Sequence, residues 1–123
     1  MQVMSESGVE MKWTPEQVKG QIPALSTDLL GKDMPEFVNL YNQHYGLDLE
    51  SKYIGLQHVV GVFEVAQFNI SGHVFVLPEA KGTVLLVHGY YDHVGLYNKI
   101  IDHCLSQGYS VFSYDLPGHG LSS

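Results

Sequence analysis

One short segment in the second half of the chain combines imidazole, carboxylate and glycine directly after an apolar run. Its sequence is Val87-His88-Gly89-Tyr90-Tyr91-Asp92-His93. Gly89 lets the chain turn tightly where a strand ends, because it has no Cβ that could clash. The backbone N–H groups that follow can then point into a crevice, where such groups stabilise the oxyanion of an acyl-transfer reaction. The segment therefore predicts a catalytic loop.

A second segment, Asp115-Leu116-Pro117-Gly118-His119-Gly120-Leu121-Ser122, follows the next apolar run. Asp115 is expected to fix its turn through backbone hydrogen bonds, and His119 is expected to have a structural place in the same turn. Gly120-Leu121-Ser122 is a G-x-S close to the end of the sequence. A nucleophile elbow needs a strand before it and a helix after it, whereas Ser122 follows a loop. Ser122 is therefore not predicted to be a nucleophile.

Strands and a helix must position these two loops. The near-continuous apolar run 83–87 predicts a central parallel strand that is buried on both faces. A helix is expected over about 94–107, ended by Gly108, and a further strand over 109–114. The helix has one apolar stripe, made of Tyr97, Ile100, Ile101, Cys104 and Leu105. A strand–helix–strand unit of this kind brings both loops to the carboxyl edge of a parallel sheet.

The elements that precede this unit are a helical leader and a hairpin. Thr14-Pro15-Glu16-Gln17 has the residues of a capping box and predicts a short helix. A second helix is expected from Pro35 to Gly46, with an aromatic stripe that packs in a core. From Val59 the apolar period becomes two, which predicts an antiparallel hairpin with its turn near 67–69.

Composition narrows the function. The chain of 123 residues carries a net charge of −7 and no arginine, which argues against a nucleic-acid partner. Residues 1–50 hold eight of the 13 acidic residues, so an acidic leader precedes a nearly neutral second half. No apolar run approaches the length of a transmembrane segment, and no secretory signal is recognisable. One cysteine, Cys104, cannot form an internal disulfide and is expected to be inert in the core. A cytoplasmic location is the default expectation.

The two loops together resemble the opening of an α/β-hydrolase, in the lysophospholipase, monoacylglycerol-lipase and serine-aminopeptidase-like group. The resemblance covers residues 57–123 and suggests a domain division into a helical leader, 1–56, and the N-terminal part of a hydrolase domain. It implies an α/β fold, an antiparallel hairpin and then a parallel strand–helix–strand unit. It also implies a serine hydrolase that cleaves a lipid-like ester without a cofactor.

The resemblance assigns roles residue by residue. The Tyr90 N–H matches one donor of the oxyanion hole, and Gly89 and His88 shape that loop. The family's nucleophile, acid and histidine are expected beyond Ser123, so the sequence is interpreted as the N-terminal piece of a longer protein. The 123-residue chain alone is expected to be inactive.

Two alternatives use the same residues. His88, Asp92 and His93 approximate the H-x-H-x-D-H run of metallo-β-lactamase-like zinc hydrolases, although Tyr90 replaces the second histidine. A non-catalytic member of the α/β-hydrolase fold, or an inactive fragment that only binds, would keep the scaffold and lose the elbow. The remaining histidines have no metal-ligand spacing and are expected at the surface or in the core: His44, His58, His73 and His103.

Overall fold

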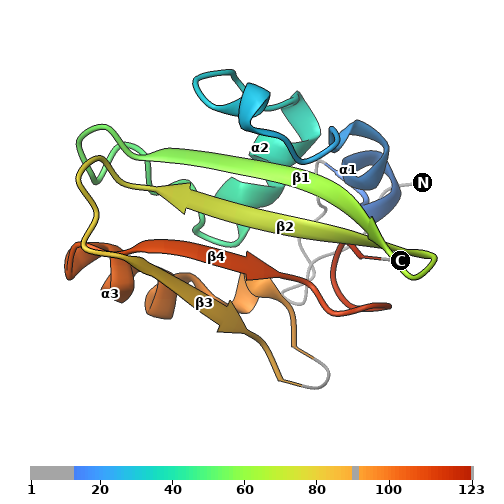
Figure 1. The fold of residues 1–123 in the computed structure, drawn as a ribbon. Coiled ribbons are helices and arrows are strands. Elements are labelled where there is room, and N and C mark those ends of the chain that lie inside the picture. Colours follow the sequence, from blue (N-terminus) through green and yellow to red (C-terminus); the bar gives the residue numbers. More distant parts are fainter. Residues whose placement is uncertain (1–12, 90–91, 123) are drawn as a thin grey trace.

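The computed structural model describes residues 13–89 and 92–122. In chain order the described elements are α1 (Pro15–Gln21), η1 (Thr27–Leu29), α2 (Glu36–His44), β1 (Gln57–Val65), β2 (Phe68–Val76), β3 (Thr83–Val87), η2 (Val94–Tyr97), α3 (Asn98–Ser106) and β4 (Ser110–Tyr114). The strands form one sheet in the order β1-β2-β4-β3 (Figure 1). β1 pairs antiparallel with β2, β2 pairs antiparallel with β4, and β3 runs parallel to β4. The predicted α/β class, a hairpin followed by a parallel strand–helix–strand unit, is confirmed.

The two leader helices are capped by side chains. The Thr14 hydroxyl accepts from the Gln17 N–H, and Gln17 Oε1 accepts from the Thr14 N–H, so the predicted capping box is present. Pro35 cannot cap α2 with a side chain, and Gln21 of α1 supplies Oε1 as an acceptor for the Phe37 N–H at 2.8 Å. This bond fixes α2 against α1, because it satisfies one of the free N–H groups at the start of a helix.

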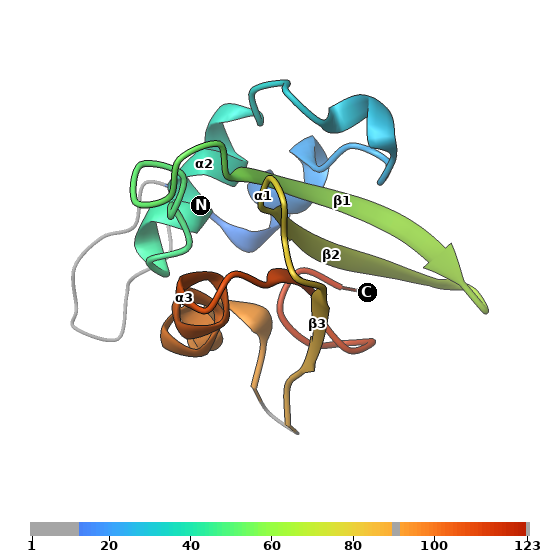
Figure 2. The ribbon, with the colours of Figure 1, turned by 60° about the vertical axis from the view of Figure 1, so that its left-hand side comes forward.

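The helices cover one face of the sheet. Figures 1 and 2 show α2 and α3 on the same side of the strands. Side chains from the leader, the sheet and α3 share one hydrophobic core that includes Val18, Val38, Val60, Phe75 and Ile101, all fully buried. The core therefore joins residues 13–56 to the rest of the described chain.

The hairpin turn lies one residue earlier than predicted. β1 and β2 pair directly from Val65↔Phe68, so the turn consists of Ala66 and Gln67. Both residues have positive φ, 47° and 75°. Two central residues with positive φ match the right-handed twist of paired strands, and this geometry normally selects Asn and Gly. The pairing of two long strands outweighs the local preference here.

β3 is not the central strand that its apolar run predicted. It lies at the edge of the sheet, paired only with β4 among the described residues, and its side chains alternate between exposed and half-buried. Leu85 is 62% exposed and Val87 46%. Among the described residues no further strand pairs with the free edge of β3. No helix covers the face of β3 that carries Leu85 and Val87.

The opposite edge of the sheet is closed by the leader. Residues 23–25 run along β1, where the Val62 N–H donates to the Pro23 carbonyl at 2.8 Å and the Leu25 N–H to the Val62 carbonyl at 2.9 Å. Gly61 permits this approach, because a Cβ there would lie 2.5 Å from the Leu25 Cα. A side chain at position 61 would therefore push the leader off the strand.

Candidate active-site loops

Two loops begin side by side at the carboxyl ends of the parallel strands. β3 ends at Val87 and β4 at Tyr114, and these two residues are paired in the register. The segments 88–93 and 115–122 therefore leave the sheet together (Figure 1). In open α/β sheets this edge is where ligand sites form.

His88 connects the two loops. Its ring is buried, and Nε2 accepts a hydrogen bond from the Leu116 N–H at 2.8 Å. Since a backbone N–H can only donate, the ring proton lies on Nδ1, which donates to the Gly89 carbonyl at 2.8 Å. Both ring nitrogens are thus occupied in holding backbone, which leaves His88 no lone pair for a proton transfer or a metal.

The first turn of this loop is held by Tyr97, a residue that the sequence placed only on an apolar stripe. The Gly89 N–H donates to the Tyr97 hydroxyl at 3.0 Å, and that hydroxyl donates to Asp92 Oδ2 at 3.2 Å. The Asp92 N–H closes the turn on the Gly89 carbonyl at 3.0 Å. The ring of a tyrosine can pack on the apolar stripe of the helix while its hydroxyl forms hydrogen bonds with the loop. In the sequence, the hydroxyl of Tyr97 was the only feature that could have indicated this second role.

Gly89 lies in the turn that Asp92 closes. Its φ is not in the left-handed region, so the turn makes no use of glycine's conformational freedom. A Cβ at this position would lie 3.3 Å from Asp92 Oδ2, which is a tight contact. The predicted oxyanion donor, the Tyr90 N–H, and the neighbouring Tyr91 lie outside the described residues.

Asp115 organises the second loop from inside the core. Its side chain is fully buried, and its two carboxylate oxygens accept three hydrogen bonds. Oδ1 accepts from the Val94 N–H at 2.8 Å, and Oδ2 accepts from the Leu121 N–H at 3.0 Å and from the Ser71 hydroxyl at 2.9 Å. The carboxylate therefore joins β2, the start of η2 and the turn after β4. Gly120 leaves room for it, because a Cβ there would lie 2.5 Å from Asp115 Oδ2.

Ser122 is part of the same network. It is 2% exposed, and its hydroxyl donates to the Asp115 carbonyl at 2.6 Å and accepts from the Ser71 N–H at 2.9 Å. A serine nucleophile needs a general base beside its hydroxyl and an open approach for the substrate. Ser122 has neither among the described residues, so its hydroxyl holds the turn. His119 lies in this turn as well, with Nδ1 3.0 Å from the Pro117 carbonyl.

His93 closes the first loop and contacts the leader. Nδ1 accepts from the Gly95 N–H at 3.1 Å, which caps η2, and the Tyr41 hydroxyl of α2 lies 3.3 Å from the same atom. Burial, with a smaller contribution from His88, lowers the pKa of His93, although Asp115 and Asp92 oppose the shift. The imidazole is therefore held neutral near pH 7.

The zinc alternative requires His88, Asp92 and His93 as ligands. Both nitrogens of His88 and Nδ1 of His93 are used in hydrogen bonds, and Asp92 accepts from Tyr97. Within residues 13–89 and 92–122, no group of three or more histidine, cysteine or acidic residues is arranged to hold a metal ion. The geometry of the loop therefore favours a structural role for these three residues.

The segment that carries both loops matches a known family. Residues 78–123 match the family model described as "Serine aminopeptidase, S33". Two solved structures are similar to about half of the chain. A predicted CIB-like hydrolase from Thermoplasma acidophilum is 22% identical, with a TM-score of 0.49, over 56% of this chain and 34% of its own. A thioesterase domain from the curacin biosynthetic pathway is 27% identical, with a TM-score of 0.47, over 55% of this chain and 24% of its own.

The match is thus confined to part of this chain and to a smaller part of each solved structure. Among curated proteins none matches the chain. None of the described helices is both long and apolar enough to cross a bilayer. Residues 78–123, which carry both loops, are therefore similar to the serine aminopeptidase family.

Proposed function

We propose that this chain is the N-terminal part of a serine hydrolase of the α/β-hydrolase fold, which cleaves a lipid-like ester through an acyl-enzyme. The family match over residues 78–123 is the observation that carries the proposal. The pairing of Val87 with Tyr114 supports it, because this register brings the His88-Gly89 loop beside the loop that begins at Asp115. A monoacylglycerol or a lysophospholipid is the substrate class that the sequence resemblance favours.

In this mechanism the chain contributes the oxyanion loop. The Tyr90 N–H would donate to the oxygen of the tetrahedral intermediate, while His88, Asp92 and Tyr97 hold the loop in place. Such a donor acts on charge that develops in the transition state, so it accelerates acylation more than it strengthens substrate binding. We place the nucleophile, the catalytic acid and the catalytic histidine in residues that follow Ser123, with residues 1–56 as a leader to the hydrolase domain.

The buried hydroxyl of Ser122 makes the placement of the nucleophile testable. A fluorophosphonate probe should label one serine of the longer protein, in a G-x-S-x-G segment that follows a strand. The chain of 123 residues should neither react with the probe nor hydrolyse p-nitrophenyl esters. Turnover by this chain that disappears in Ser122→Ala would overturn the placement. A longer protein that folds, contains no G-x-S-x-G segment and does not react with the probe would favour the non-catalytic alternative.

The oxyanion role is tested at Tyr90 in the longer protein. Tyr90→Phe keeps the N–H and should leave kcat within about a few-fold, because only the hydroxyl is lost. Tyr90→Pro removes the N–H and should lower kcat by about 10²–10³, the effect of one oxyanion donor. KM should change less than kcat. Circular dichroism must first show that the proline variant is folded; a folded variant with normal kcat would refute the role.

A further inference from the structure

Residues of the leader reach the first candidate active-site loop. Helix α2 carries Tyr41, and Tyr45 follows at its C-terminal end; both side chains contact the His93 ring, which ends that loop. The Tyr41 hydroxyl lies 3.3 Å from His93 Nδ1, and the Tyr45 ring meets the imidazole edge-on, with 4.9 Å between the ring centroids. Tyr41 and His93 are 52 residues apart in the sequence, so this contact depends on the fold.

The backbone determines where the proton lies on the His93 ring. The Gly95 N–H donates to Nδ1 at 3.1 Å, and since a backbone N–H can only donate, Nδ1 carries a lone pair. The Tyr41 hydroxyl therefore donates to this lone pair as well. Burial, and then Asp115 and Tyr45, raise the pKa of Tyr41 well above its usual range, so the hydroxyl keeps its proton near pH 7. His93 Nδ1 thus accepts from one donor of η2 and from one donor of the leader.

The leader and the loop are packed closely where they meet. A Cβ at Gly95 would lie 2.7 Å from His93 Cε1 and 2.8 Å from Tyr45 Cγ, so only glycine fits between the imidazole and the leader. Tyr41 is 3% exposed, and the Trp13 ring packs edge-on against it with 5.3 Å between the centroids. The Tyr41 hydroxyl is therefore already held in place by packing when it binds His93.

His93 lies between the two candidate loops. Before it in the chain, the Asp92 N–H closes the turn of the first loop on the Gly89 carbonyl. After it, the Val94 N–H donates to Asp115 Oδ1 at 2.8 Å, at the start of the second loop. A displaced imidazole would therefore move backbone that is bonded to both loops.

We propose that Tyr41 is a positioning residue for the proposed hydrolysis: its hydroxyl holds His93, and through His93 it fixes the end of the first loop. The inference rests on the proposed function, since a positioning residue acts only where a reaction takes place. The geometry of the loop matters most in the transition state, so loss of the hydroxyl lowers kcat more than it raises KM. The leader then belongs to the catalytic machinery, although the family match begins at residue 78.

NMR of the 123-residue chain tests the contact without any reaction. Tyr41→Phe removes only the hydroxyl and should shift the imidazole signals of His93 and the amide signal of Gly95. Tyr53→Phe is the matched control, because the Tyr53 hydroxyl also joins the leader to a later element, the Asp102 carbonyl of α3, at 3.0 Å. Unchanged His93 signals in Tyr41→Phe, or equal shifts in both variants, would overturn the proposal.

Hydrolysis of p-nitrophenyl esters by the longer protein tests the effect on the reaction. Tyr41→Phe should lower kcat by about tenfold, because a misplacement of about 1 Å can cost about 10²-fold and the loop keeps its other bonds. KM should stay within about twofold, and Tyr53→Phe should change neither constant. A folded Tyr41→Phe protein with normal kcat would overturn the positioning role. A folded wild-type protein without turnover or reaction with a fluorophosphonate probe would refute the proposed function, and the positioning role with it.

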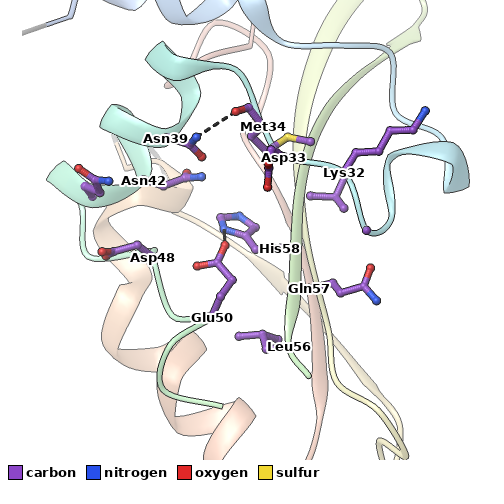
Figure 3. Close-up of a pocket in the computed structure, with 13 residues that line it drawn as sticks. Lys32, Asp33, Met34, Asn39, Asn42, Asp48, Glu50, Leu56, Gln57 and His58 are labelled. Atoms are coloured by element: carbon purple, nitrogen blue, oxygen red, sulfur yellow. Dashed lines mark hydrogen bonds and ion pairs between the residues drawn. The ribbon is translucent and has the colours of Figure 1, made fainter. Parts of the chain in front are cut away.

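Another side of α2 shows whether the effect belongs to the whole helix. It lines a cavity of about 400 Å³ beside the start of β1, where Asn39 Nδ2 donates to the Met34 carbonyl at 2.9 Å (Figure 3). Asn39→Ala removes this bond but not the Tyr41 contact, so kcat should stay within about twofold. A loss equal to that of Tyr41→Phe would assign the effect to the stability of α2 and refute the role of Tyr41.

A double-mutant cycle tests whether Tyr41 acts through His93. His93→Asn removes the imidazole but keeps a side chain that can cap η2. In this background Tyr41→Phe should change kcat by less than about twofold, because the partner of the hydroxyl is already lost. A tenfold loss in both backgrounds would show that Tyr41 acts by another route and would overturn the proposal.

Discussion

On the covered face of the sheet the deeply buried strand residues include Ser71, His73 and Ser113, whereas the opposite face presents Phe68, Leu85 and Val87 to solvent. From hydrophobicity alone, the two serines and the histidine would be expected at the surface, and the three apolar residues in the core. The two serines have partners: the Ser113 hydroxyl donates to the Leu86 carbonyl at 2.7 Å, and the Ser71 hydroxyl donates to Asp115 Oδ2 at 2.9 Å. Burial in this sheet therefore follows the helices that cover it and the hydrogen bonds that lead to the loops.

The open face forms a shallow apolar hollow. It is lined mainly by apolar residues of all four strands, among them Phe63, Ile70, Leu85 and Phe112. Leu116 and Pro117, at the start of the second loop, also line this hollow. We therefore expect substitutions on the covered face to change the stability of the protein and the geometry of the site, and substitutions on the open face to have little effect on either.

The largest expected effect comes from two phenylalanines of β2 that lie on opposite faces. Phe75 is fully buried, and Phe75→Ala should lower the free energy of unfolding by about 3–5 kcal/mol, because it opens a cavity in the core. Phe68 is 47% exposed on the open face, and Phe68→Ala should cost under about 1 kcal/mol. Urea unfolding followed by circular dichroism measures both values. Similar losses in the two variants would abolish the distinction between the faces.

Acid should destabilise the covered face selectively. Burial lowers the pKa of His73 from 6.5, the usual value for histidine, to about 4. The unfolded state therefore binds more protons between these two values, so stability is complete above about pH 6.5 and falls as the pH decreases toward 4. The expected loss of stability over this pH range is on the order of 3 kcal/mol. His58 and His93 act in the same direction.

Urea midpoints measured at several pH values through this window give the slope of stability against pH. The side-chain NMR signals of His73 provide a second readout, since its imidazole should stay neutral until the pH approaches about 4. A stability that stays constant between about pH 6.5 and 4 would show that the covered imidazoles are not held neutral by the fold.

The buried carboxylate gives an intermediate effect. Asp115→Asn keeps the shape but replaces one charged acceptor by an NH₂ group, which faces either the Val94 N–H or the pair formed by Leu121 and Ser71. The expected loss is about 1.5–3 kcal/mol, the range for a hydrogen bond to a charged group. The exposed control Glu64→Gln should change stability by less than about 0.5 kcal/mol. Hydrogen exchange should increase at Val94 and Leu121, and unchanged exchange there would contradict the role of Asp115.

The smallest change in stability is expected on the open face. Leu85→Lys introduces a charge at an exposed position of the edge strand, so the free energy of unfolding should change by under about 0.5 kcal/mol. The apolar hollow should nevertheless bind less of a hydrophobic fluorescent dye, and the protein should aggregate less at high concentration. Dye fluorescence and light scattering measure these two effects. A large loss of stability would show that this face is part of the core.

The sequence predicted the order of the elements, because each has a strong local signal. The capping box at Thr14, the apolar period of α3 and the position of the two loops at strand ends all follow from residue types and spacing. The sequence could not predict that β3 lies at the edge of the sheet. An apolar run indicates that a strand can be buried on both faces, but it does not indicate which strands and helices lie beside it. The turn at Ala66 and Gln67 was misplaced because neither residue is typical of positive φ.

The candidate site was predictable in position but not in its connections. His88 and Asp115 could be placed at strand ends by counting along the chain. Their partners come from distant segments: Ser71 lies on β2, and Tyr97 lies on a different element from the loop that it holds. Hydrogen bonds over such separations depend on the register of the sheet and the packing of η2, which no local pattern specifies. For the same reason no local pattern indicated that His58 and His73 form a buried pair.

The strip of leader at residues 23–25 determines how copies of this chain could associate. By pairing with Val62 it occupies the outward N–H and carbonyl of that residue and blocks the approach of another strand to β1 there. Among the described residues, β3 is then the edge strand whose outer side can accept another strand along its length. Two copies joined strand to strand through β3 would each present a closed edge to the outside. Growth by sheet extension therefore stops at a pair and cannot propagate into a fibril, as long as the leader stays on its strand.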